Sequence, residues 1–590
     1  MIRKNWPVPA FVKPDRRDKL AHEAGRISEV FEQHFAGSTM PGLSFAIVVD
    51  DAIVCASGLG LRELASAEAP NVDTVYRIAS MTKSFTAAAV MLLRDRGALR
   101  LDEAALSYLP EMSEFSETTK DSAPITVRDL MTMSSGWPQD DPWADRQLYR
   151  DDESMLRLYA QGVSAANPPG LTFEYSNLAY MLLGRLVTRV SGIDSMTFIN
   201  QELLAPLGMH ASCWNESDVA PTRLAPGYRY EDDMWKEEPR LASGGDVAAF
   251  AGLFSSTGDL ARWAAMFMDA YPPRDDAETS PLKRASLREM QGVHRVHRHE
   301  RLPHHVHERA TTRSSGYGYG LLMRDDGENW SAGHSGGVPG YGSHMRWLPE
   351  HGVGVIALAN VTYAALESAC ADALQLIGRD LLNAPRRAQA SSALLVAQDG
   401  VNRLLNEWDD DVARDLFADN FFLDKDVEHW QSELAQVRAT LGDFEPDGGR
   451  LSPHNWLRGQ WRRPAQWGWC HIWITMAPTV PPRIQLLRLT PNRFPSELLQ
   501  RTAESVAALV GCADQQALAE LLADDAPREQ VRRAMWAASA RLGAATLGGY
   551  IAGDGHAKGR WHLHGRHGDL LLELVMNGAE RPSDIRFIAV

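Results

Sequence analysis

An internal duplication near the C-terminus is the feature that most constrains the fold of this 590-residue chain. When the last third of the sequence is compared with itself, four blocks align in the same order at an offset of about 100 residues. The matching blocks are 416–420 with 521–525, 441–442 with 542–543, 459–461 with 559–561, and 482–484 with 582–585. Blocks that keep both order and offset indicate a tandem repeat, so the chain should end in two copies of one small domain.

Each copy has two helical patterns followed by two or three strand patterns, which predicts a small α+β module. This layout is similar to that of cystatin-like and nuclear-transport-factor-like domains. A plausible linker at 383–395 precedes the first copy. We therefore predict three domains, at 1–385, 396–492 and 498–590.

The larger N-terminal part alternates between strand and helix patterns. Strand patterns at both of its ends enclose helical patterns, which predicts an α+β body that carries a helical insertion. The expected strand pairs lie at 43–60 and 344–361, and the expected helices at 81–96, 177–190, 257–269 and 363–382.

Composition and charge exclude several classes of partner. The 60 Lys and Arg residues face 76 Asp and Glu residues, a net charge of −16. Without a basic excess, neither nucleic acid nor an anionic membrane is an expected partner. No apolar run reaches the length of a membrane span, and the first residues lack a secretory apolar region, so a cytoplasmic protein is expected. The five scattered cysteines suggest neither a disulfide framework nor a zinc site.

Ser80 and Lys83 stand three residues apart at the start of the helix expected at 81–96. This spacing places a lysine amine beside a serine hydroxyl, which needs a base to become a nucleophile. The positive end of the helix also favours a developing oxyanion. Only one other of the nine lysines has a serine three residues before it, in Ser280-Pro281-Leu282-Lys283. There, proline after serine predicts an ordinary N-cap at Ser280.

Two further segments carry groups that could complete such a site. Tyr175 and Asn177 precede an apolar helix; a tyrosine can relay protons, and an amide can hold a lysine or a substrate carbonyl. Taken alone, Tyr175 could be an ordinary amphipathic residue at a helix start. His334 and the glycines up to Gly337 allow close approach of a substrate to the backbone, although alone they would predict only a glycine turn.

Together these segments resemble the serine β-lactamase-like family, in its branch of class C β-lactamases, D-aminopeptidases and related esterases. The resemblance covers about residues 20–382 and rests on segments that occur in family order: 74–93, 125–136, 168–187, 205–209, 254–263, 317–321 and 333–341. It implies an antiparallel sheet flanked by helices, together with a helical lobe.

The resemblance also implies roles for individual residues. Ser80 would be the acylated nucleophile, Lys83 and Tyr175 would share acid and base work, and Asn177 would orient them. The remaining assignments are an oxyanion hole from the backbone N–H groups of Ser80 and Gly337, the third motif at His334, and substrate contacts from Ser335 and Gly336.

The third motif departs from that of the β-lactamases. β-Lactamases and D-Ala-D-Ala carboxypeptidases carry Lys-Thr-Gly there, whereas D-aminopeptidases and several esterases carry His-x-Gly, which His334 matches. A mostly neutral histidine weakens recognition of a substrate carboxylate. We therefore expect a peptidase, amidase or esterase that acts on small or linear peptides, including D- or modified residues. The alternatives are a β-lactamase or D-Ala-D-Ala carboxypeptidase, and an inactive penicillin-binding-like receptor or scaffold.

Other features allow two interpretations each. Trp137, Asp140 and Asp141 could bind the apolar part and the ammonium of a substrate, or they could belong to a solvated acidic loop. The six histidines within 294–307 fit a basic insertion better than a metal site, and no metal or cofactor is expected. The C-terminal copies could restrict access to the site or join two chains into a homodimer.

Overall fold

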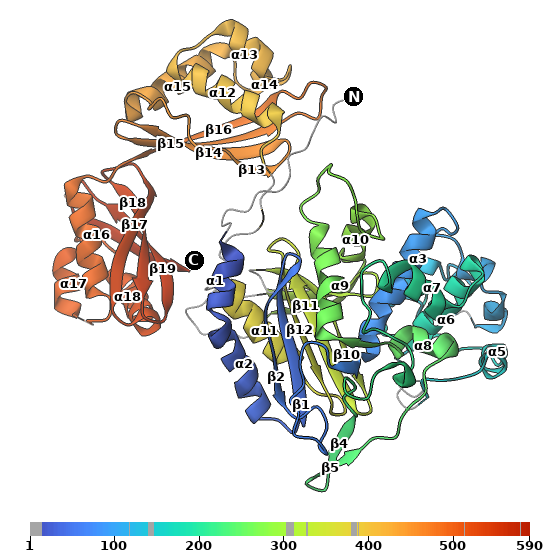
Figure 1. Ribbon diagram of the computed structural model, residues 1–590. Helices are drawn as coiled ribbons and strands as arrows, with labels where there is room; N and C mark the ends of the chain where they lie inside the picture. Colours follow the sequence, from blue (N-terminus) through green and yellow to red (C-terminus); the bar gives the residue numbers. More distant parts are fainter. Residues whose placement is uncertain are drawn as a thin grey trace. The chain divides into compact units, whose positions relative to one another are not determined.

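The computed structural model (Figure 1) describes residues 15–116, 118–139, 147–301, 312–325, 329–378, 386, 389–512, 514–578 and 580–589. The described residues fall into two compact units, one up to residue 386 and one from residue 389 onward. The first unit is α+β, as predicted from the sequence. Among the described residues, no helix has the length and apolar character to cross a membrane.

An eight-stranded antiparallel sheet forms the centre of the first unit. Its spatial order is β2-β1-β12-β11-β10-β9-β8-β7, so strands from the two ends of the unit pair side by side. The strands are β1 (Gly42–Val49), β2 (Ala52–Gly60), β7 (Arg295–Arg301), β8 (Thr312–Tyr317), β9 (Leu322–Asp325), β10 (Trp330–Val338), β11 (Tyr341–Leu348) and β12 (Val353–Ala359). Every residue of β1, β11 and β12 is buried, because both faces of the sheet are covered there.

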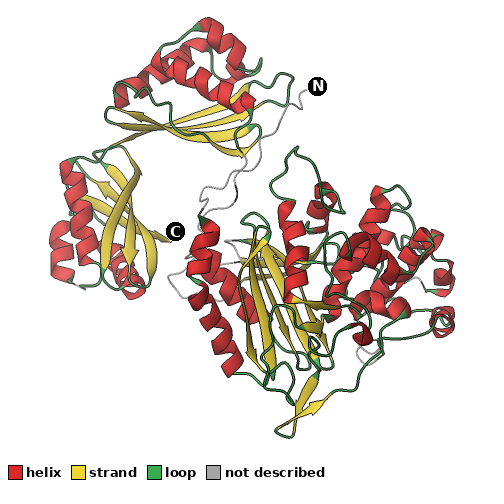
Figure 2. Ribbon diagram, viewed as in Figure 1, coloured by secondary structure: helices red, strands yellow, loops and turns green. Residues whose placement is uncertain are grey.

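Helices cover the two faces of this sheet differently, as Figure 2 shows. One face packs against helices from the two ends of the unit, and Phe31 of α2 stacks on Phe45 of β1 with ring centroids 4.1 Å apart. These helices are α1 (Arg16–His22), α2 (Ala24–Ala36) and α11 (Glu367–Leu376). The other face packs against α9 (Thr257–Asp269) and, beyond it, the helical lobe.

The helical lobe surrounds α3 (Thr82–Asp95), whose residues from Thr82 to Leu93 are all buried. Three consecutive alanines let neighbouring helices approach it closely. The other α-helices between β2 and β7 are α4 (Val127–Met131), α5 (Asp152–Ala160), α6 (Asn177–Ser191), α7 (Ser195–Ile199), α8 (Gly245–Ala251) and α10 (Arg284–Met290). Short segments complete this region: β3 (Val75–Arg77), β4 (Tyr228–Glu231), β5 (Met234–Glu237), β6 (Phe254–Ser256), η1 (Ala79–Met81), η2 (Ala105–Ser107), η3 (Pro110–Glu114), η5 (Asn200–Leu204) and η6 (Glu216–Asp218).

The second unit contains two copies of one small α+β fold. The first copy has α12 (Ser392–Asn406), α13 (Asp410–Leu416), α14 (Phe421–Asp424), α15 (Val427–Leu441), β13 (Ser452–Asn455), β14 (Arg458–Ala465), β15 (Gly468–Met476) and β16 (Ile484–Arg493). The second copy has α16 (Glu497–Leu509), α17 (Gln515–Leu521), α18 (Arg528–Leu542), β17 (Ala545–Gly553), β18 (Lys558–Gly565), β19 (Gly568–Met576) and β20 (Pro582–Ala589).

The two copies correspond element by element. Each has a four-stranded antiparallel sheet in sequential order with its own apolar core, and helices lie along one face of the sheet (Figure 2). Equivalent glycines end α15 and α18: Gly442 has φ 76° and Gly543 has φ 69°, a conformation that favours glycine. The predicted pair of α+β modules is confirmed. The predicted two helices and two or three strands were too few, because short helices and edge strands have weak periodicity.

Three local expectations need correction. The glycine turn considered at 333–337 is part of strand β10. The basic insertion considered at 294–307 begins as strand β7, which pairs with β8; His304, His305 and His307 lie outside the described residues. The N-cap predicted at Ser280 is wrong, since α10 begins three residues later than expected, at Arg284.

Candidate active site

Ser80 and Lys83 lie where the short helix η1 passes into α3. The Lys83 side chain is fully buried, and its Nζ donates to Ser80 Oγ at 3.0 Å. The same amine donates to Asn177 Oδ1 at 2.8 Å and to the carbonyl oxygen of Phe250 at 3.3 Å. The helical spacing predicted from the sequence therefore joins the hydroxyl and the amine directly, and Asn177 holds the amine from the opposite side.

The residue before the serine has a strained backbone. Ala79 is buried and has φ 49°, in a region that side chains other than glycine adopt at a cost. The turn is held against the sheet because Ser343 Oγ of β11 donates to the carbonyl oxygen of Ile78 at 2.7 Å. This strain and this anchor fix the direction in which Ser80 leaves the backbone.

Tyr175 and Asn177 stand on either side of Ser176, the N-cap of α6. The ring of Tyr175 lies with its centroid 4.8 Å from Lys83 Nζ and 6.3 Å from the centroid of the His334 ring. The backbone N–H of Glu174 donates to the carbonyl oxygen of Met133 at 2.8 Å. The loop that carries Tyr175 is therefore fixed on both sides of the tyrosine.

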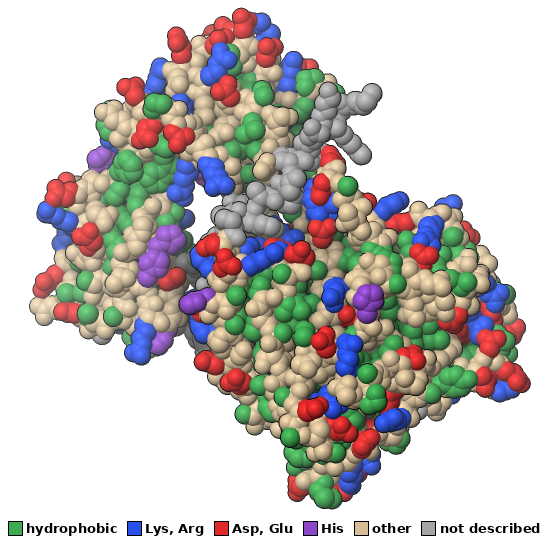
Figure 3. Space-filling view, viewed as in Figure 1, with side chains coloured by type: hydrophobic (Ala, Val, Ile, Leu, Met, Phe, Trp, Pro, Cys, Tyr) green, Lys and Arg blue, Asp and Glu red, His purple; other side chains and the backbone are tan. Residues whose placement is uncertain are grey.

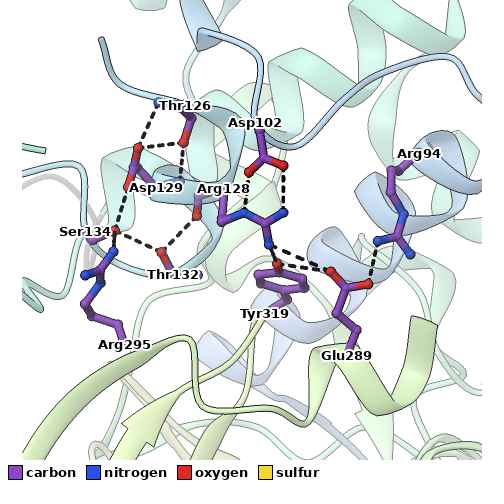
Figure 4. A network of polar contacts seen from close by, with 10 residues as sticks. All are labelled: Arg94, Asp102, Thr126, Arg128, Asp129, Thr132, Ser134, Glu289, Arg295 and Tyr319. Atoms are coloured by element: carbon purple, nitrogen blue, oxygen red, sulfur yellow. Dashed lines mark hydrogen bonds and ion pairs between the residues drawn. The ribbon is translucent and has the colours of Figure 1, made fainter. Parts of the chain in front are cut away.

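The support for this loop comes from the segment 126–136, drawn in Figure 4. Thr126 and Asp129 form a reciprocal capping box at the start of α4, and Asp129 also accepts from Ser134 Oγ at 3.0 Å. The carbonyl oxygen of Ser134 then accepts from the backbone N–H of Gly170 at 2.7 Å. The segment 125–136, noted in the sequence only for its resemblance, thus positions the tyrosine loop.

Figure 4 also shows a chain of charges that ties α4 to the rest of the lobe. Arg128 pairs with Asp102 through two guanidinium nitrogens, at 2.6 Å and 3.0 Å. Glu289 of α10 contacts Arg94 of α3 at 2.5 Å and Arg128 at 3.8 Å. These contacts fasten the supporting segment to the helix that carries Lys83.

His334 lies on β10 as a buried neutral imidazole. Burial, and secondarily the charge of Lys83, lower the pKa of His334 from 6.5 to about 3. Because its Nδ1 faces the carbonyl oxygen of Ser335 at 2.6 Å, Nδ1 carries the proton and donates. Nε2 accordingly accepts from the hydroxyl of Tyr317 at 3.0 Å. The third motif therefore supplies no positive charge.

Glycines let β10 lie against the nucleophile turn. A Cβ atom at Gly336 would stand 2.2 Å from the carbonyl oxygen of Ile78, so only glycine fits there. Strand β9 pairs with β10 only as far as Gly333, so among the described residues no strand pairs with 334–338 on that edge. The backbone near Gly337 can therefore form hydrogen bonds with a bound substrate instead of with another strand.

A cavity of about 260 Å³ opens at this junction. Its walls are Ser80, Tyr175, Asn177, Phe250, Ala251, Gly337, Val338 and Tyr363. The structure thus brings Ser80, Tyr175, Asn177 and Gly337 to one cavity, with Lys83 and His334 directly behind it.

Other predicted site residues lie elsewhere. Ser335 alternates with His334 along β10, so it faces the other side of the sheet, where its Oγ bonds to Nδ1 of the buried His344 at 2.8 Å. Trp137 is only 1% exposed and packs edge-on against Phe115, which corrects the prediction that it holds a substrate. Asp140 and Asp141 lie outside the described residues.

Sequence reasoning missed four residues of the cavity wall: Phe250, Ala251, Val338 and Tyr363. Two of them, Phe250 and Tyr363, bring aromatic rings to the cavity. Tyr363 is 51% exposed, has φ 53°, and lies over Gly337, where an added Cβ would meet its ring at 2.6 Å. Phe250 reaches the cavity from α8. Thr86 Oγ1 of α3 holds this helix in place by donating to the carbonyl oxygen of Ala249 at 2.6 Å. Neither residue has a spacing signal, because each reaches the cavity only through the tertiary fold.

The histidines at the start of the segment 294–307 have structural partners. His294 stacks on Tyr319 with ring centroids 4.1 Å apart, and His299 bonds to Ser314 Oγ at 2.8 Å. The ring of His297 lies 4.4 Å from that of Phe173. Within the described part of the chain, no group of three or more His, Cys, Asp or Glu residues is arranged to hold a metal ion.

The fold and this cluster define the class of β-lactamase-like serine hydrolases. A family model described as Beta-lactamase matches residues 27–379, more than half of the chain, and the chain belongs to this family. The resemblance drawn from the sequence segments is thereby confirmed.

Two curated relatives and one solved structure place the chain within this class. It is 24% identical over 338 residues to protein Flp of Staphylococcus aureus, covering 57% of this chain and 63% of that protein. It is 26% identical over 377 residues to the unguisins hydrolase UngD′ of Aspergillus campestris, covering 61% and 65%. The chain therefore matches less than two thirds of the length of either relative. The octameric penicillin-binding protein homologue from Pyrococcus abyssi shares the fold, with a TM-score of 0.51 at 18% identity over 96% of this chain and 98% of that one.

Proposed function

We propose that the protein hydrolyses amide or ester bonds of small or linear peptides through an acyl-enzyme on Ser80. The observation that carries this proposal is the contact of Lys83 Nζ with both Ser80 Oγ and Asn177 Oδ1 at the wall of one cavity. A nucleophile, a base and a group that orients the base are the minimum set for acyl transfer.

The proposed acylation begins from the form of the protein in which the Lys83 ammonium has lost one proton to solvent, so that its amine can act as a base. Its Nζ takes the proton of Ser80 Oγ as that oxygen attacks the carbonyl carbon of the substrate. The negative oxygen that forms is held by the backbone N–H groups of Ser80 and Gly337. Tyr175, whose ring lies beside Lys83, delivers a proton to the leaving amine or alcohol as the bond breaks. In deacylation the Tyr175 oxygen, left without its proton, takes a proton from the water that attacks the ester carbon. As the bond to Ser80 Oγ breaks, the Lys83 ammonium returns its proton to that oxygen and the acid is released.

The third motif limits the class of substrate that we propose. A neutral His334 provides no fixed cation for a substrate carboxylate, which disfavours β-lactams and peptides with a C-terminal D-Ala. The name of the Aspergillus relative describes a hydrolase of unguisins, which supports a peptide-like substrate for this chain. D- or modified residues fit the same proposal. A β-lactamase or D-Ala-D-Ala carboxypeptidase is the second candidate, because the chain shares its family with β-lactamases.

Tyr363 is proposed to contact the acyl side of the substrate. Its half-exposed ring lies over Gly337 at the cavity wall, and the fold keeps its backbone at a strained φ of 53°. A flat ring at this place stacks on an aromatic or apolar group of a substrate.

A panel of p-nitroanilides and p-nitrophenyl esters, in L and D series with free and blocked amines, tests the proposal. We expect turnover of at least one series, abolished in Ser80→Ala and retained in the matched control Ser280→Ala. Nitrocefin and a D-Ala-D-Ala peptide test the second candidate. No turnover of any substrate, together with no labelling of Ser80 by a fluorophosphonate, would instead favour an inert receptor or scaffold.

We also propose that the chain divides at 1–385, 396–492 and 498–590 and that the two C-terminal copies mediate homodimerisation. Each copy having its own apolar core supports this division. Light scattering of the full chain tests the second part, with a dimer expected and a concentration-independent monomer contradicting it.

A further inference from the structure

Within the part of the chain that the structure describes, the two C-terminal copies each leave one sheet face without covering helices. In the first copy, side chains at alternate positions of β14 to β16 point to this open face. Its central row, in register across three strands, is Gln460, Trp473 and Arg488. Trp473 is 38% exposed, a large value for a tryptophan in the middle of a sheet.

Charge is distributed unevenly in this first copy. Between Asp447 and Glu497 the sequence has seven arginines and no acidic residue, although the whole chain is strongly acidic. This stretch contains the entire sheet, whereas the preceding helices are rich in Asp and Glu, visible over the top of the molecule in Figure 3. The sheet side of the module is therefore a local positive field on an acidic protein.

Three of these arginines, Arg458, Arg462 and Arg488, surround Trp473 on the open face. All three are exposed, and within the described residues none of them forms an ion pair with a carboxylate. The guanidinium of Arg462 lies 5.5 Å from the ring centroid of Trp469, the next tryptophan on the same face. Exposed tryptophan beside arginine without an acidic partner is the composition of binding hot spots.

The second copy provides an internal comparison on the same scaffold. Its central row is Arg560, Glu573 and Arg586, so a glutamate occupies the position of Trp473. Glu573 is only 4% exposed; it pairs with Arg560 and lies 3.8 Å from Arg586. Lys558, at the position of Arg458, lies 3.9 Å from the same carboxylate. The cations of the second face thus share a carboxylate of their own copy, whereas those of the first face have no such partner among the described residues.

We propose that the open sheet face of the first copy binds an acidic peptide segment of another protein. Carboxylates of the peptide pair with Arg458, Arg462 and Arg488, and an apolar or aromatic side chain between them stacks on Trp473. Nucleic acid fits less well, because three arginines can neutralise only a few phosphates of a long polyanion. The inference is independent of the chemistry at Ser80.

Binding is tested on the full-length protein with a fluorescein-labelled peptide of about eight alternating Glu and Tyr residues, long enough to cross a four-stranded face. A Gln-Tyr peptide, a Lys-Tyr peptide and an oligothymidylate of similar length are the comparison probes. We expect the Glu-Tyr peptide to bind at least about tenfold more tightly than the other three, with affinity that falls as salt rises from about 50 to 300 mM. Equal binding of the Gln-Tyr peptide, tighter binding of the oligothymidylate, or no binding of the Glu-Tyr peptide would overturn the proposal.

Variants locate the binding to this face. The triple change Arg458→Gln, Arg462→Gln and Arg488→Gln should weaken Glu-Tyr binding roughly tenfold and flatten its salt dependence. Trp473→Ala should weaken it by a similar factor. The matched control is Lys558→Gln, at the position of Arg458 in the second copy, with a change of less than about twofold expected. A larger loss in the control than in the triple variant would contradict the assignment.

Unfolding curves distinguish lost binding from lost folding. The substituted side chains, Arg458, Arg462, Trp473, Arg488 and Lys558, are all exposed, so we expect the variants to unfold like the wild type. Should Trp473→Ala unfold early, the triple arginine variant decides the outcome. If the triple variant is folded and still binds the Glu-Tyr peptide as the wild type does, the proposal is wrong.

Discussion

The chain contains the same Ser-x-x-Lys spacing twice, in two different environments. Ser80 and Lys83 join at 3.0 Å because both stand at the start of α3, and the amine is buried beside Asn177. Lys283 is the exposed N-cap residue of α10, and Ser280 lies in a bend that precedes that helix. The spacing places a nucleophile beside a base only where a helix aligns the serine with the lysine and the surrounding residues hold the lysine.

The largest difference in activity between the two sites is expected when each serine is replaced by alanine. Ser80→Ala should lower kcat/KM by roughly 10,000-fold, because no other group in the cavity can form the acyl-enzyme. Ser280→Ala should stay within about twofold of the wild type, since Ser280 does not line the cavity. Kinetics on the best substrate of the panel measure both. Similar losses in the two variants would remove the distinction between the sites.

Removing the lysines tests the proposed base. Lys83→Ala should lower kcat by roughly 1,000-fold while Ser80 remains in place. Lys283→Ala should leave kcat unchanged. Steady-state rates together with unfolding curves measure the effect, because a cavity at position 83 also destabilises the buried helix. A folded Lys83→Ala variant with full activity would assign the base elsewhere.

A smaller effect is expected at the proposed proton donor. Tyr175→Phe should lower kcat by roughly 100-fold with little change in KM, because the ring remains and only the hydroxyl is lost. The control is Tyr180→Phe in α6, because the ring centroid of Tyr180 also lies near Lys83 Nζ, at 5.8 Å. Separate measurement of kcat and KM checks this prediction, and an unchanged kcat in Tyr175→Phe would exclude the tyrosine as donor.

The lowered pKa of His334 leads us to expect that the free energy of unfolding changes gradually with pH. Its pKa is about 3 in the folded protein and near 6.5 when unfolded, so between these values the unfolded chain binds a proton that the folded one does not. The free energy of unfolding should therefore fall as pH decreases from about 6.5 toward 3, by up to about 1.4 kcal/mol per pH unit from this residue. His334→Gln should reduce that slope in denaturant titrations of the first unit. An identical slope in the variant would show that His334 is not the group responsible.

Much of the fold was predictable because its elements have strong periodicity. The helix at α9 coincides with the predicted 257–269, and β1 and β2 lie within one residue of the predicted hairpin. Strand β10 was not predictable, since glycines weaken strand patterns and are needed there only because Ile78 approaches closely. The repeat was visible because turn glycines such as Gly442 and Gly543 keep their spacing.

The candidate site was predictable where neighbours in sequence act together. Ser80 with Lys83, and Tyr175 with Asn177, each occupy one helix start. Trp137 was misassigned because the sequence does not show that a loop tryptophan turns into the core. Tyr363 was missed because it reaches the cavity from the loop that follows β12 in the sequence.

The central claim is that Ser80, and no other serine, forms the acyl-enzyme. A fluorophosphonate or a slow ester substrate, followed by intact mass measurement and peptide mapping, tests it most directly. The account predicts one added acyl or phosphonyl group, mapped to the peptide that contains Ser80 and absent from Ser80→Ala. Labelling that persists in Ser80→Ala, or that maps to the peptide containing Ser280, would contradict it.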